Sequence, residues 1–132
     1  MPTIIRRQVS NLIETRRDVY VTSNWQVHSS VWTPPTDVYE TESSLIIKVE
    51  VAGMREEDFE VVVEEQILMI RGQRSDQNER RAYHQMEIRF GKFEIAVGLP
   101  SGLNLEEASA EYNHGFLTVT FPKMQSKQIE VE

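Results

Sequence analysis

A change of hydrophobic period after a proline pair is the feature that most constrains how this chain folds. Pro34 and Pro35 fix two φ angles and remove two amide donors, so a structural boundary is expected there. Beyond them, apolar and polar residues alternate in short runs separated by glycine, proline or acidic turns. Such alternation is typical of half-buried strands, and it predicts an antiparallel all-β sandwich. The expected strands are residues 45–51, 59–64, 68–72, 93–99 and 117–121, with weaker ones at 37–41 and 108–112.

A hairpin is expected between the last two strands. Gly115 in Asn113-His114-Gly115 can adopt a positive φ without steric cost, which suits a tight turn. Ala108 and Ala110 precede this turn, and their small side chains leave shallow space beside the strand. A partner's larger side chains would fit in that space, or the two alanines simply fit a crowded core.

The proline pair divides the chain into an N-terminal arm (1–32), the sandwich (33–123) and a C-terminal tail (124–132). The arm carries four arginines against two carboxylates, whereas the remainder carries ten basic against nineteen acidic residues. An acidic body disfavours binding to a phosphate backbone, so no nucleic-acid partner is expected. The basic arm would aid self-association, or its charge is ordinary solvation.

Apolar residues in the arm fall near helical spacing. Ile5, Val9, Leu12 and Ile13 would form the stripe of a short amphipathic helix, which must bury that stripe against something to be stable. No apolar stretch of the chain is long enough for a signal peptide or a membrane span, so we expect a cytoplasmic protein.

A long charged excursion, residues 74–91, does not suit a compact sandwich. It contains an alternating stretch, with His84, Met86, Ile88 and Phe90 on one side. A strand inside such an excursion has an exposed edge, and a neighbouring subunit would pair with it by strand addition. The alternative is a flexible surface hairpin of the same chain.

An isolated Ile129-Glu130-Val131 closes a polar tail. In an extended peptide, residues two apart point to the same side, so Ile129 and Val131 would point the same way with no core of their own. This pattern predicts a plug for a groove on another copy of the chain.

Signatures of catalysis are missing from the sequence. There is no cysteine, the histidines are scattered, and the glycines are single, so neither a metal cluster nor a phosphate-binding loop is indicated. The serines lack the context of an activated nucleophile. We therefore expect a protein that is not an enzyme, uses no cofactor or ATP, and acts by binding.

Five motifs in order resemble the small heat-shock proteins, the family built on the α-crystallin domain. They run from Trp32 to the C-terminus: WTPPTDVYET at 32–41, VAGMREEDFEV at 51–61, LMIRGQR at 68–74, the Ala110-x-x-x-x-Gly115-x-Leu117 signature, and Ile129-Glu130-Val131. Two positions depart from the family pattern. Ala52 stands where a proline is usual, and Ile95 stands where many members have an arginine that pairs with acidic groups at the dimer contact.

The resemblance implies an immunoglobulin-like sandwich that acts as an ATP-independent holdase, which binds unfolding proteins and suppresses their aggregation. It implies a homodimer formed by strand exchange, in which Tyr83, His84, Gln85, Met86, Glu87 and Ile88 pair with Asp37, Val38 and Tyr39 of the other copy. The tail residues would then join dimers into a larger homo-oligomer by entering a groove formed by Val61, Val62, Val63, Ala108 and Ala110. Apolar residues of the arm would bind client proteins: Ile4, Ile5, Leu12, Ile13, Trp25 and Trp32.

Two other functions share this type of fold. A co-chaperone of the p23 or CS-domain type has the same sandwich but is usually monomeric, and both the excursion and the tail argue against it. A carbohydrate-binding module would need clustered aromatic residues, whereas the tryptophans and tyrosines are dispersed along this chain.

Overall fold

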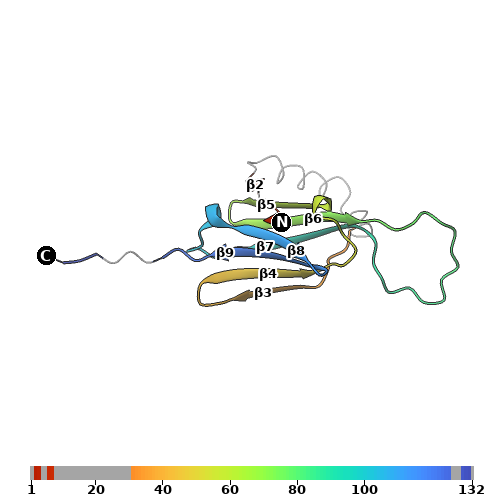
Figure 1. Ribbon diagram of the computed structural model, residues 1–132, viewed down its shortest axis with the longest axis horizontal. Coiled ribbons are helices and arrows are strands. Elements are labelled where there is room, and N and C mark those ends of the chain that lie inside the picture. Colours follow the sequence, from red (N-terminus) through yellow and green to blue (C-terminus); the bar gives the residue numbers. More distant parts are fainter. Residues whose placement is uncertain (1, 4–5, 8–30, 126–128, 132) are drawn as a thin grey trace.

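Two β-sheets stack face to face in the computed structural model, which describes residues 2–3, 6–7, 31–125 and 129–131 (Figure 1). The five-stranded sheet, called sheet A, has the order β1 (Pro2–Thr3), β8 (Ser109–Asn113), β9 (Phe116–Pro122), β4 (Ser44–Glu50) and β3 (Thr36–Glu40). The four-stranded sheet B has the order β2 (Arg6–Arg7), β5 (Phe59–Glu64), β6 (Ile67–Arg74) and β7 (Gly91–Gly98). Two short 3-10 turns precede strands, η1 (Glu56–Asp58) before β5 and η2 (Leu105–Glu107) before β8. The predicted all-β sandwich is thereby confirmed.

The core lies between the two sheets and follows the alternation seen in the sequence. Every second residue of the long strands points inward, as the strand period requires. Sheet A contributes Leu45, Ile47, Val49, Leu117, Val119 and Phe121, and sheet B contributes Val61, Val63, Leu68, Ile70, Phe93 and Ile95. Ile95, which departs from the family pattern, is therefore an interior residue.

The middle strand residues of sheet B depart from simple alternation. Val62 lies between two core-facing valines and points to the opposite face, yet it is as fully buried as they are. It pairs in register with Met69 of β6, and the two form a small apolar cluster separate from the core. Both faces of sheet B therefore bury apolar side chains at this point.

Two hairpins use the same tight turn geometry with different residues. His114 and Gly115 connect β8 to β9 with positive φ angles of 52° and 84°, as the sequence predicted. Glu65 and Gln66 connect β5 to β6 with φ angles of 49° and 63°. Neither of these residues favours positive φ, so the second turn could not be predicted from the sequence.

The structure describes only parts of the arm. Arg6–Arg7 form β2, a strand paired with β5. The stripe of the expected helix (Ile5, Val9, Leu12 and Ile13) lies outside the described residues. Trp32 is only 7% exposed, and its ring packs edge-on against Phe93 while its indole N–H donates to the Gly91 carbonyl at 3.2 Å. Trp32 is thus part of the sandwich and is not available as a client-binding residue. The other predicted arm residues (Ile4, Ile5, Leu12, Ile13 and Trp25) lie outside the described residues.

Gly72 gives a test of how tightly sheet B packs. A Cβ at this position would overlap the Phe93 ring and meet the Asp58 carbonyl oxygen, whereas a Cβ at Gly98 would meet open space. Replacing Gly72 with alanine is expected to lower the free energy of unfolding by about 1–3 kcal/mol, because the core must shift to accept the methyl group. Gly98→Ala is the matched control and should change stability by less than about 0.5 kcal/mol. Urea or thermal unfolding measures both, and equal stability of the two variants would contradict this packing.

Candidate assembly surfaces

The excursion between β6 and β7 projects from one end of the sandwich, and the tail leaves from the opposite end (Figure 1). Residues 75–90 are exposed and form no strand within this chain. Met86 and Ile88 are both 64% exposed, and Tyr83 and Phe90 also face solvent. The alternating stretch predicted as a strand is therefore an unpaired, partly apolar segment in the single chain.

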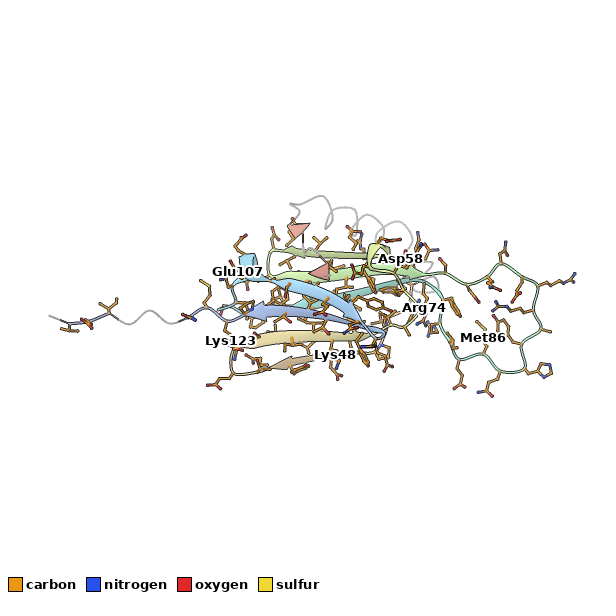
Figure 2. All side chains as sticks on the ribbon, viewed as in Figure 1. Lys48, Asp58, Arg74, Met86, Glu107 and Lys123 are labelled. Carbon is orange, nitrogen blue, oxygen red and sulfur yellow. The ribbon has the colours of Figure 1, made fainter. Side chains whose placement is uncertain are left out.

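Arg74, the last residue of β6, holds the two ends of the excursion together. Its guanidinium donates from Nε to the Arg89 carbonyl at 2.9 Å and from Nη1 to the Ala52 carbonyl at 3.1 Å. The same group lies over two aromatic rings, 4.7 Å from the Trp32 centroid and 5.4 Å from the Phe90 centroid. Figure 2 shows Arg74 at this neck and Met86 farther out along the excursion. Arg74 thus fixes where the excursion leaves the sandwich.

A second charged cluster lies inside the excursion. Arg81 contacts both carboxylate oxygens of Asp76, at 2.6 and 3.1 Å, and also bonds Glu79 and the Tyr83 hydroxyl at 2.8 and 2.9 Å. The hydrogen bonds from Arg81 hold the pKa of Asp76 below its ordinary value, and this pairing raises the pKa of Arg81. The cluster therefore stays charged at neutral pH and orients Tyr83, although its exposure to solvent makes it weak.

β3 is an open edge of sheet A. It pairs with β4 on one side, and among the described residues no strand pairs with its other side. Val38 and Tyr39 are exposed on this strand. No large apolar residue on the other described strands has a more exposed side chain. The two segments that the resemblance pairs in the dimer, residues 83–88 and 37–39, are thus both unpaired in the single chain.

The tail and its expected acceptor are separated in this chain. Ile129 is 79% exposed and Val131 is 95% exposed, so neither side chain has a site in its own molecule. Of the acceptor residues, Val61 and Val63 face the core, Val62 faces the opposite side, Ala110 is buried and Ala108 packs against the core. The five residues therefore do not line one open groove. What they share is their position on or beside β5 and β8, at the same side of the sandwich.

Tyr112 of β8 ties this region to the neck of the excursion. Its hydroxyl donates to the Val51 carbonyl at 2.8 Å and accepts from the Met54 amide at 3.3 Å. These bonds hold the turn that contains Ala52, the residue whose carbonyl receives Arg74. The position of the excursion therefore depends on β8 through one short turn.

Sequence reasoning missed Arg74 and the role of Trp32. A single arginine at a strand end has no pattern that separates it from a solvated charge, and a lone tryptophan near a proline pair has no periodicity. The roles of Arg74 and Trp32 depend on contacts between residues that are distant in sequence: Arg74 meets residues 32, 52, 89 and 90 only in the folded chain.

Metal and membrane signatures are absent from the described part of the chain. It holds no group of three or more histidine, cysteine, aspartate or glutamate side chains arranged for a metal ion. None of its helical turns has the length and apolar character needed to cross a membrane.

Comparison with known proteins places the chain in a family. Small heat shock protein C2 of Rickettsia felis is 32% identical over 104 residues, which are 75% of this chain and 68% of that protein. The 17.4 kDa class I heat shock protein of Arabidopsis thaliana is 37% identical over 99 residues, which are 73% of this chain and 64% of the relative. A solved small heat-shock protein from Xylella fastidiosa superposes with a TM-score of 0.66 at 25% identity, over 76% of this chain and 97% of that one.

The chain spans about two-thirds of the length of the curated relatives it matches, and slightly less for most of them. The match to the family covers residues 37–132, which include the sandwich from β3 onward, the excursion and the tail. The chain belongs to the Hsp20/alpha crystallin family.

Proposed function

We propose that this chain is an ATP-independent holdase chaperone of the cytoplasm that binds unfolding proteins and works as a dimer-based homo-oligomer. One observation carries the proposal: the single chain leaves an open strand edge, an unpaired alternating segment and an exposed apolar tail at the same time. Exposed edges and isolated apolar side chains are liabilities unless something covers them. Relatives named as small heat shock proteins support a chaperone role.

The dimer in this proposal forms by mutual strand exchange. Residues 83–88 of one copy pair with Asp37, Val38 and Tyr39 on the free edge of β3 in the other. Main-chain hydrogen bonds supply affinity, and the exposed apolar residues on both segments supply contact area. A two-fold arrangement lets each copy give one segment and accept the other, so both edges are satisfied at once.

The tail joins dimers into a larger particle. Burying Ile129 and Val131 contributes roughly 3–5 kcal/mol before the cost of ordering the tail is subtracted. One such contact is weak, but several in a closed particle reinforce one another through effective concentration. Subunits can then leave and rejoin, and their release exposes apolar surface to clients.

Clients would bind the apolar residues of the arm (Ile4, Ile5, Leu12, Ile13 and Trp25), with Trp32 excluded by its burial. The strongly acidic body keeps a complex with an unfolded protein in solution, because like charges oppose further association. The absence of cysteine suits a reducing compartment.

A client assay tests the proposed function directly. We expect the purified chain to suppress light scattering from a heat-labile test enzyme at about equimolar ratio, and we expect added ATP to leave this effect unchanged. An equal concentration of an unrelated monomeric β-sandwich protein is the control. Failure to protect, together with a monomeric mass in solution, would favour a p23-like co-chaperone instead.

The tail role predicts a change in particle mass. Replacing Ile129 and Val131 with glycine removes both apolar side chains, so light scattering coupled to size exclusion should report dimers where the unaltered chain forms a larger particle. Glu130→Gly, the neighbour that points the other way, is the control and should keep the large mass. An unchanged mass in the double variant would exclude the tail as the contact between dimers.

The neck of the excursion should control dimer affinity. In the glycine-tail background, Arg74→Ala removes the bonds to Arg89 and Ala52, so the excursion loses its fixed direction and must be ordered on pairing. We expect the dimer dissociation constant, measured by sedimentation, to rise about tenfold, with faster hydrogen exchange in residues 75–90. Arg74→Lys should be nearly as weak, because an ammonium cannot make both bonds and both ring contacts.

Arg80→Ala removes the same charge elsewhere in the excursion and is the matched control. Its dimer affinity should equal that of the parent. A similar loss in both variants would mean that net charge, not the neck geometry, governs the contact.

A further inference from the structure

Two of the methionines that the structure describes have exposed side chains. Met86, on the excursion, is 64% exposed, and Met124, at the start of the tail, is 60% exposed (Figure 2). Met54 and Met69 are buried, with 9% and 4% of their surface exposed. Because the chain has no cysteine, these two exposed thioethers are the sulfur atoms of the described residues that a peroxide in solution reaches most readily.

The free edge of β3 borders the core on one of its two sides. Val38 pairs in register with Ile47 of β4, and Ile47 is a core residue. Register partners lie on the same face of a sheet, so Val38 lies on the core-facing side of β3. It is 48% exposed there, and among the described residues no strand lies beyond it. A strand added at this edge therefore extends the core next to Val38.

The segment that would be added has one apolar side and one polar side. In an extended conformation Met86 and Ile88 point to one side, whereas Gln85 and Glu87 point to the other. The polar pair stays in water because burying a charge or an unpartnered amide is costly. The apolar pair then lies on the core-facing side of the edge. Pairing of residues 83–88 with another copy therefore removes the Met86 sulfur from water.

Oxidation reverses the polarity of this side chain. A peroxide gives one oxygen atom to the thioether: a sulfur lone pair forms the S–O bond while the O–O bond breaks. The proton on the transferred oxygen moves to the leaving oxygen, which departs as water when the oxidant is hydrogen peroxide. The sulfur is oxidised by two electrons and the peroxide is reduced by two. The product sulfoxide is polar and accepts hydrogen bonds, and an apolar contact offers it no donor.

We propose that Met86 is an oxidation site that controls the dimer. In the free subunit its sulfur is accessible to peroxide, and after oxidation residues 83–88 no longer pair stably with β3 of another copy. Reduction of the sulfoxide by a thiol-dependent reductase returns the thioether, so the change is reversible. This inference rests on the strand exchange of the proposed function, and it adds a chemical control of that contact. Because pairing and oxidation oppose each other, the dimer also protects Met86.

Sedimentation of peroxide-treated protein tests the site. The full chain should carry Ile129→Gly and Val131→Gly, so that the dimer contact alone is measured. Hydrogen peroxide is the probe, catalase then removes it, and peptide mass spectrometry reports the sulfoxide at each methionine. We expect the dimer dissociation constant to rise about tenfold or more, because two-fold symmetry places a sulfoxide in each of the two strand contacts. Methionine sulfoxide reductases with dithiothreitol should restore the original value.

Met86→Leu and Met124→Leu are the matched variants, and each is compared with itself before and after peroxide. Met124→Leu should respond as the parent does, because it retains Met86. The dissociation constant of Met86→Leu should not respond, although its Met124 is still oxidised. Met86→Gln places a permanent polar group in the contact, and without peroxide it should dimerise about tenfold more weakly than Met86→Leu.

The rate of oxidation gives a second measurement. Raising the protein concentration well above the dimer dissociation constant should slow the oxidation of Met86 about tenfold, because only the free subunit reacts. The rate at Met124, which lies outside the dimer contact, should stay the same.

The outcomes separate the oxidation site from the dimer. An equal response to peroxide in Met86→Leu and Met124→Leu overturns the oxidation site and leaves strand exchange standing. A Met86 oxidation rate that does not depend on protein concentration shows that pairing leaves the sulfur in water, and it also overturns the site. A monomeric mass of the untreated parent at every concentration overturns strand exchange and the oxidation site with it.

Discussion

The main-chain edges of the two sheets are the constraint on which the rest of this structure depends. A sandwich of open sheets has four edges, and each presents N–H and C=O groups that need partners. In the described chain, β1 pairs with β8 and β2 pairs with β5 on one side. On the other side, Trp32 covers part of β7 through main-chain bonds to Lys92 and Glu94, and β3 stays open. The proposed dimer uses the edge of β3, which the described part of the chain leaves uncovered, and the proposed oligomer uses the edges of β5 and β8, which pair with β2 and β1 in the single chain.

Trp32 covers part of one sheet edge and also helps to position the excursion. Its main chain pairs with β7, its ring packs on Phe93 in the core, and its outer face receives the Arg74 guanidinium. An arginine over a tryptophan contributes about 0.5–2 kcal/mol, depending on how far water is excluded. Because Arg74 also donates to the Arg89 carbonyl, both ends of the excursion are attached, through Arg74 and Trp32, to the core. The two ends of the excursion are thus fixed before a partner binds. This lowers the conformational entropy that the excursion loses on pairing.

Much of the fold could be predicted because strand alternation is a local signal. A side chain at every second residue must face the core whatever the partner strand is. The strands at Leu45 to Val51 and Leu117 to Phe121 can therefore be predicted from the sequence alone. The parts that escaped prediction depend on contacts distant in sequence. A two-residue strand such as Arg6–Arg7 has no period, so the sequence gives no sign of it. Likewise, Glu65 and Gln66 adopt the left-handed conformation because the register of β5 and β6 leaves two residues for the turn, not because either residue favours it.

The two proposed contacts differ in strength, and this difference determines which contact is lost first when the particle disassembles. Strand exchange pairs several consecutive residues in each direction, with main-chain bonds and apolar contact repeated twice by symmetry. The tail contributes only two apolar side chains, Ile129 and Val131. Loss of tail contacts should therefore come first as protein concentration falls or temperature rises, and disassembly should pause at the dimer. Each released dimer would keep its strand-exchange contacts, while the acceptor of the tail and the rest of its apolar surface are free for an unfolding protein.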